Sequence, residues 1–122
     1  MNELIESILN NFTVDGVQIP VSFLFYMGHG EPYITYQQEN VDNVLEGDDG
    51  LIGYADYYDF DVYCKGNYTN IIRVLRGILE SNGFVWQISR SSGDMYDPET
   101  GYYHKTLNFA YLRQDTEIIH SL

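Results

Sequence analysis

Residues 59–84, DFDVYCKGNYTNIIRVLRGILESNGF, decide the fold. In the first part of this stretch every second residue is apolar, which is typical of a strand with one buried side: Phe60, Val62 and Cys64. After Asn67, which is placed to cap a helix, apolar residues recur at helical spacing: Ile71, Ile72, Leu75, Ile78 and Leu79. Gly83 can take the left-handed conformation that ends such a helix near Asn82. The stretch predicts a strand that leads into a helix.

Further elements are expected on both sides of this stretch. Residues 2–12 have an apolar stripe and predict a short N-terminal helix. Pro20 has no N–H to donate, so the strand that contains it is expected at a sheet edge or at a bulge. Leu107 and Phe109 mark the inner side of the last strand. The strands are predicted at residues 17–27, 33–45, 51–64, 84–91 and 102–114.

Short turns join most of these strands, and short turns favour antiparallel pairing. The sequence has no internal repeat and no linker, so residues 1–122 are expected to form one domain. We therefore predict an α+β fold: a mostly antiparallel sheet with the N-terminal helix and the central helix packed on one face.

Charge and tyrosine content limit the possible functions. The 122 residues include 18 acidic and 6 basic residues, which gives a net charge of −12. Such a chain lacks the basic surface with which proteins bind nucleic acid. The 12 tyrosines suit either strand surfaces or buried protein–protein contacts, and both interpretations stay open.

Cys64 is the one cysteine of the chain, and it is either a nucleophile or a core residue. A catalytic thiol requires an electropositive, partly exposed position and a nearby histidine. Cys64 instead continues the apolar side formed by Phe60 and Val62, among acidic neighbours that would raise the pKa of the thiol. We therefore expect it to be buried and unreactive.

The sequence does not predict secretion or membrane insertion. The N-terminus lacks the pattern of a signal peptide, and no apolar run approaches the ~20 residues that span a bilayer. We expect a chain made in a reducing cytosol, with no membrane partner.

No catalytic or metal-binding motif is found. His29, His104 and His120 have no zinc-ligand spacing, and the acidic stretches EGDDG and DMYDPE lack the spacing of a calcium loop. Asp59 and Asp61 are expected on the outward side of a strand, with no apolar pocket to separate their pKa values. Phosphate-binding loops and a Ser–His–Asp order are also missing. We predict a protein that is not an enzyme and has no cofactor or metal.

The order of elements resembles a known family. The segments that carry the likeness are an early strand opened by EPYITYQ, a long strand that runs into a helix (YYDFDVYCKGNYTNIIRVLRGILESNGF), and a closing strand, KTLNFAYLRQ. Together with the N-terminal helix they resemble the tail-terminator (tail-completion) proteins of long-tailed bacteriophages. The likeness extends over about residues 1–114.

This resemblance implies an α+β virion protein without catalytic residues. Such proteins assemble in the host cytoplasm into a ring, typically a hexamer, on the last ring of the tail tube. The ring ends polymerisation of the major tail tube protein and offers the surface that docks head-completion or neck proteins. DNA passes through the ring without specific binding.

Within this interpretation, two kinds of exposed residue are expected to have a role in the ring. Acidic residues would line the lumen and repel DNA phosphates: Asp48, Asp49, Asp94, Asp97 and Glu99. Tyrosines would form subunit interfaces: Tyr57, Tyr63, Tyr96, Tyr102 and Tyr103. The connection SGDMYDPETG, residues 92–101, is expected to reach an adjacent subunit or the tube.

Two alternatives stay open. A small acidic inhibitor, either a DNA mimic or an immunity protein, could present Asp56, Asp59 and Asp61 together with the two acidic loops as a phosphate-like row. A related component of the head-to-tail neck would share the acidity and the ring.

Overall fold

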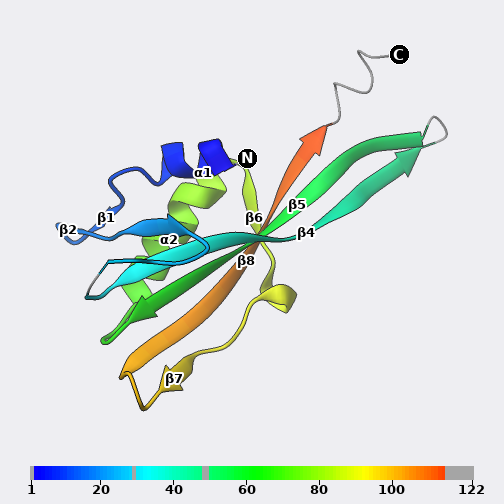
Figure 1. Cartoon of the computed structure of the whole chain (residues 1–122). Coiled ribbons are helices and arrows are strands. Elements are labelled where there is room, and N and C mark those ends of the chain that lie inside the picture. Colours follow the sequence, from blue (N-terminus) through cyan, green and yellow to red (C-terminus); the bar gives the residue numbers. More distant parts are fainter. Residues whose placement is uncertain (1, 29, 48–49, 115–122) are drawn as a thin grey trace.

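The computed structural model describes residues 2–28, 30–47 and 50–114. It has an α+β fold in which two helices pack on one face of a mostly antiparallel sheet, as predicted (Figure 1). The elements are, in chain order, α1 (Asn2–Ile8), β1 (Thr13–Val14), β2 (Val17–Gln18), β3 (Val21–Phe23), β4 (Tyr33–Gly47), β5 (Gly50–Cys64), α2 (Thr69–Ser81), β6 (Phe84–Trp86), the 3-10 helix η1 (Ile88–Arg90), β7 (Met95–Asp97) and β8 (Tyr102–Gln114).

The main sheet has the order β3-β4-β5-β8-β6, and β7 pairs with β8 further along that strand. All of these pairs are antiparallel except β3 with β4, which run parallel. The predicted strand 17–27 is not continuous in the structure. Pro20 separates β2 from β3, and its carbonyl accepts a hydrogen bond of 2.9 Å from the Ile34 N–H. β3 lies at a sheet edge, as the proline predicted.

The core lies between the helices and the inner face of the sheet. The predicted core residues are all buried, with exposed fractions of 0–7%: Phe60, Val62, Cys64, Ile71, Leu75, Leu79, Leu107 and Phe109. Helix α2 begins after Asn67, whose side-chain oxygen accepts the Thr69 N–H at 2.9 Å. It ends before Gly83, which has the predicted left-handed conformation with φ of 93°.

Two element boundaries were predicted wrongly. Helix α1 stops at Ile8 rather than residue 12, although Leu9 and Phe12 still contribute to the core. The predicted strand 84–91 is a strand only to Trp86. Beyond it, both backbone and hydroxyl groups bond to β8: the Gln87 N–H donates to the Asn108 carbonyl at 2.8 Å, and the Ser92 N–H donates to the Thr106 carbonyl at 2.9 Å. The Asn108 N–H donates to Ser91 Oγ at 3.0 Å, and the Thr106 N–H donates to Ser92 Oγ at 2.9 Å.

The two longest strands and the end of β8 project well beyond the helices (Figure 1). We call residues 39–47, 50–57 and 112–114 the arm, because none of their described side chains belongs to the hydrophobic core. The β4–β5 register shifts between Gln38 and Asn40, between Asn43 and Leu45, and between Leu45 and Glu46. Such bulges bend and twist a strand pair, so the arm diverges from the plane of the body.

Candidate functional site

The face of the sheet opposite α1 and α2 is here called the open face; the Arg90 side chain of η1 reaches over it to Tyr57. Its side chains come from the alternate residues of each strand. Cross-strand partners on this face form three rows: Tyr33, Tyr63 and His104; Thr35, Asp61 and Thr106; Gln37, Asp59 and Asn108. This face is mostly polar and aromatic, so it is the natural place to look for chemistry.

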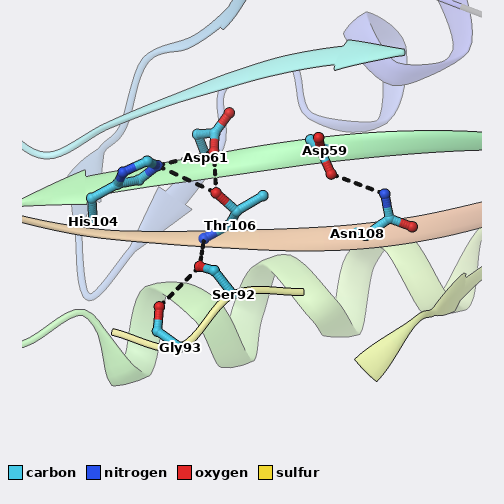
Figure 2. Close-up of polar contacts among 7 residues, drawn as sticks. All are labelled: Asp59, Asp61, Ser92, Gly93, His104, Thr106 and Asn108. Atoms are coloured by element: carbon cyan, nitrogen blue, oxygen red, sulfur yellow. Dashed lines mark hydrogen bonds and ion pairs between the residues drawn. The ribbon is translucent and has the colours of Figure 1, made fainter. Parts of the chain in front are cut away.

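A polar cluster joins β5 to β8 on the open face (Figure 2). The carboxylate of Asp61 accepts a hydrogen bond from the Thr106 hydroxyl and lies 2.9 Å from His104 Nε2. Asp61 lies on the outward side of its strand, as predicted, but it is only 9% exposed there. Two polar partners compensate for its loss of water.

This cluster does not have the geometry of an activated nucleophile. In a catalytic triad, the two nitrogens of the histidine contact the carboxylate and the nucleophile separately. Here the same nitrogen, His104 Nε2, lies 2.9 Å from Asp61 and 3.4 Å from the Thr106 hydroxyl. The hydroxyl donates to the carboxylate instead of to the imidazole. The cluster therefore acts as a cross-strand tie.

The carboxyl group of Asp59 is partly buried beside Asn108. Partial burial raises the pKa of its carboxyl group, while the hydrogen bond from Asn108 opposes that shift. The sequence was interpreted as giving Asp59 and Asp61 no apolar pocket to separate their pKa values, and the burial that raises the pKa of Asp59 was not expected. The burial comes from packing across strands, which the local pattern does not encode.

Cys64 is buried, with 6% of its surface exposed. The Gly66 N–H lies 3.4 Å from its sulfur, and burial raises the pKa of the thiol. A thiol with a raised pKa stays protonated near neutral pH and is a poor nucleophile. The prediction that Cys64 is a core residue is confirmed.

The predicted acidic residues do not form one group. Asp94 accepts a hydrogen bond from Tyr68 and lies 3.6 Å from the Lys105 ammonium, and these contacts lower the pKa of its carboxyl group. Asp97, the last residue of β7, and Glu99, in the turn that joins β7 to β8, are exposed. Asp48 and Asp49 lie outside the described residues, as do His29, His120 and the tail 115–122. Gly47 at the end of β4 and Gly50 at the start of β5 lie at the opposite end of the sheet from the β7–β8 turn (Figure 1).

The inhibitor alternative expected Asp56, Asp59 and Asp61 to form one exposed row of carboxylates, and the structure separates them. Asp56 is 2% exposed and binds Arg113, with 2.9 Å between Oδ2 and Nε. Arg113 stacks on Tyr54, so this group lies on the sheet face opposite to Asp59 and Asp61. These three carboxylates do not form one exposed row.

Two of the predicted interface tyrosines are already engaged within the chain. Tyr63 stacks between Tyr33 and His104, with ring centroids 4.7 and 4.3 Å away, and Tyr26 continues this ladder at 4.6 Å from Tyr33. Tyr57 lies under the Arg90 guanidinium at 3.8 Å. The ladder was not predicted, because it depends on the cross-strand register.

The other three predicted tyrosines gather near β7. Tyr96 and Tyr103 are 54% and 41% exposed, and their ring centroids lie 4.7 Å apart. Tyr102 is half-buried and contacts Tyr33 edge-on at 5.8 Å. These tyrosines remain accessible to a partner. That residues 92–101 reach a neighbouring subunit stays a prediction.

Exposed apolar side chains mark two further surfaces. One is the loop after β3, where four large apolar residues are 44–82% exposed: Phe23, Leu24, Phe25 and Met27. The other is a hollow on the open face, next to the arm, lined by Asp42, Ala55, Tyr57, Val85, Gln87, Ala110 and Leu112.

Metal-binding and membrane-spanning features were also searched for in the described parts of the chain. Residues 2–28, 30–47 and 50–114 contain no group of three His, Cys, Asp or Glu side chains that could hold a metal ion. Within the same ranges, neither helix has the length and hydrophobicity needed to cross a bilayer.

Comparison with known proteins gives no family assignment. No protein-family model matches the sequence, and no curated protein matches it significantly.

Proposed function

We propose that this chain is a ring-forming structural protein of the tail-terminator type, which caps a phage tail tube and offers a docking surface for the head. One observation carries the proposal: a three-stranded arm extends beyond the helices (Figure 1), and none of its described side chains belongs to the hydrophobic cluster between the helices and the sheet. Such an extension offers a surface that a partner can cover.

The backbone of the arm supports this interpretation. β3 pairs with β4 only over Ile34–Tyr36, so among the described strands the rest of β4 pairs on one side only, with β5. An unpaired strand edge can accept a strand from another molecule. In a ring, each arm would lie against the next subunit or the tube.

The charge of the chain supports a passive conduit for DNA. A net charge of −12 disfavours binding of phosphates, and a DNA channel must not retain its cargo. The polar cluster and Cys64, which lack the geometry of a catalytic site, are consistent with a protein that acts through its surfaces.

The first experiment measures assembly with the tail tube protein. We expect purified chain to form rings, seen by mass photometry and electron microscopy, and to shorten tubes when it is present during polymerisation. Tubes of unchanged length at excess chain would overturn the proposal.

A matched pair of variants tests the arm. Asp42 and Ala55 are cross-strand partners, so residues 43–54 can be replaced by Asn-Gly to give a short hairpin. We expect this variant to keep its body folded, by circular dichroism and thermal unfolding, and to lose rings and tube capping. The control is Arg73→Gln on the exposed side of α2, which should retain both. A folded arm-deleted chain that still caps tubes would contradict the role of the arm.

A further inference from the structure

A short connection runs along β8 near the base of the arm. Residues 87–92, here called the strap, follow β6 and include η1. The N–H groups of Gln87 and Ser92 donate to carbonyls of β8 at 2.8 and 2.9 Å, and Ser91 Oγ accepts the Asn108 N–H at 3.0 Å. The strap is therefore fixed to β8 at both of its ends.

The side chain of Arg90 extends from the strap over β5 to β4. The Cζ atom of its guanidinium lies 3.8 Å from the ring centroid of Tyr57 on β5. Nη1 lies 3.2 and 3.0 Å from the two carboxylate oxygens of Glu39, and Nη2 lies 3.5 Å from Asp42 Oδ2, both on β4. Because the sheet order is β4-β5-β8, this one side chain connects the strap beside β8 to a strand that is not its neighbour.

A β-bulge brings both carboxylates to the same side of β4. In a regular strand, residues 39 and 42 would point to opposite faces, because they are three positions apart. Both nevertheless contact Arg90, since the register shifts between Gln38 and Asn40 and leaves Glu39 without a partner on β5. The contacts of Arg90 are thus made at the bulge where the arm begins.

Arg90 also compensates negative charge at the base of the arm. Its guanidinium contacts Glu39 and Asp42, and Asp59 is near enough to respond to the same groups. Burial is the main reason that the pKa of Asp59 is raised, and Glu39 raises it further while Arg90 lowers it. Without Arg90, these carboxylates would repel one another across β4 and β5.

Residues 39–47 of β4 have few other contacts that hold them in place. Among the described strands they pair on one side only, with β5, and three register shifts interrupt that pairing. None of their described side chains belongs to the hydrophobic core. Segments with few buried contacts open most readily, so the contacts of Arg90 can decide whether this segment stays closed.

We propose that Arg90 is a latch: it holds residues 39–47 of β4 on β5, and loss of its contacts lets this segment open. Arg90 is a positioning residue in this role, because it acts through Glu39, Asp42 and Tyr57. The inference concerns the isolated chain and does not depend on the proposed function.

Hydrogen exchange of the full chain, followed by mass spectrometry, tests the latch. Arg90→Met removes the charge and should leave the strap folded, because the hydrogen bonds of the strap to β8 do not use the Arg90 side chain. We expect residues 39–47 to exchange about tenfold faster than in wild type, the order that an ion-pair network and a cation–π contact together justify. Residues of α2 should keep their wild-type rates.

Arg76→Met is the matched control. Arg76 makes the same two kinds of contact within the body: its Nη2 lies 2.9 Å from Glu80 Oε1, and its Cζ lies 3.9 Å from the ring centroid of Trp86. Its loss should leave exchange of residues 39–47 unchanged. Unchanged exchange of this segment in Arg90→Met, or equal acceleration in both variants, would overturn the inference.

Salt provides a second test that needs no variant to fold. At ~1 M salt the screening length falls to about 3 Å, so the ion pairs of Arg90 weaken. Exchange of residues 39–47 should then become faster in wild type. In Arg90→Met it should become slower, because salt screens the carboxylates that remain. A wild-type segment whose exchange does not respond to salt would contradict the latch.

The latch and the proposed function can fail separately. If Arg90→Met accelerates exchange as expected but wild-type chain leaves tube lengths unchanged, the latch is correct and the tail-capping function is wrong. If wild-type chain caps tubes but exchange in Arg90→Met is unchanged, the function stands and the latch is wrong.

Discussion

Asn108 donates a hydrogen bond from Nδ2 to Asp59 Oδ1 at 2.9 Å, while its own Oδ1 has no partner in the described structure (Figure 2). Asn108 is fully buried, so the cross-strand bond to Asp59 is its main side-chain compensation. The same packing raises the pKa of Asp59. Polar side chains on the open face are thus buried against one another between the strands. The following variants test how they contribute to stability.

Asp59→Asn should make stability less dependent on pH. A carboxyl group whose pKa is raised by folding destabilises the folded state when ionised, and this penalty is lost as the pH falls through the raised value. We expect the variant to be more stable than wild type at pH 7, by less than about 1 kcal/mol because water still screens the carboxylate. The difference should vanish below pH ~4, the unfolded value. Urea unfolding at both pH values checks this, with the exposed Asp97→Asn as control.

Asp61→Ala should destabilise the protein by about 2 kcal/mol, because Thr106 and His104 both lose their partner in a largely buried position. The comparison is Glu99→Ala in the exposed β7–β8 turn, which should change the free energy of unfolding by less than about 0.5 kcal/mol. Equal effects of the two changes would show that the cluster is not a cross-strand tie.

Gly28→Ala should displace Tyr26 from the aromatic ladder. A Cβ atom at Gly28 would lie 2.3 Å from the Tyr26 hydroxyl oxygen, so this flexible side chain must move off Tyr33. The near-ultraviolet circular dichroism of the tyrosines should decrease, with a stability loss of about 1 kcal/mol or less. Gly66→Ala is the matched control, because nothing lies within 4 Å of its Cβ position. An unchanged spectrum for Gly28→Ala would contradict the stacking.

Gly77→Ala should stabilise the protein by about 0.5–1 kcal/mol, because alanine favours a helix interior over glycine. Gly77 lies within α2, and its Cβ position is open space. Gly83→Ala should have the opposite sign, since φ of 93° is strained for alanine. Thermal unfolding of both variants measures the two signs, and a stabilising Gly83→Ala would refute this account of the helix end.

Removing acidic charge should slow DNA ejection if the chain lines a DNA channel. The variants combine Asp97→Asn with Glu99→Gln, at exposed positions, and separately Asp48→Asn with Asp49→Asn, which lie outside the described residues. Loss of negative charge weakens the repulsion of phosphates and favours retention of DNA. Ejection kinetics of phage carrying each pair measure the effect, and unchanged kinetics for both pairs would reject an acidic lumen.

The sequence alone determined the parts of the fold that local periodicity encodes. Alternation in residues 58–64 placed Phe60, Val62 and Cys64 on the inner face, and helical spacing did the same for Ile71, Leu75 and Leu79. Both patterns indicate which side of a helix or strand is apolar, and that side must be buried against the apolar side of another element. Gly83 and Pro20 were informative because each acts on the backbone at its own position: glycine readily adopts a positive φ, and proline has no N–H to donate.

Only the tertiary structure decided what depends on register between strands. Asp61 meets Thr106 and His104, and Tyr63 meets Tyr33, because β5 pairs with β4 and β8 in one register and not another. A shift of one residue would turn each of these side chains to the opposite face. The arm, the parallel pairing of β3 and the hollow lined by Ala55 and Ala110 arise in the same way. They result from contacts between residues that are distant in the sequence, and no local pattern records those contacts.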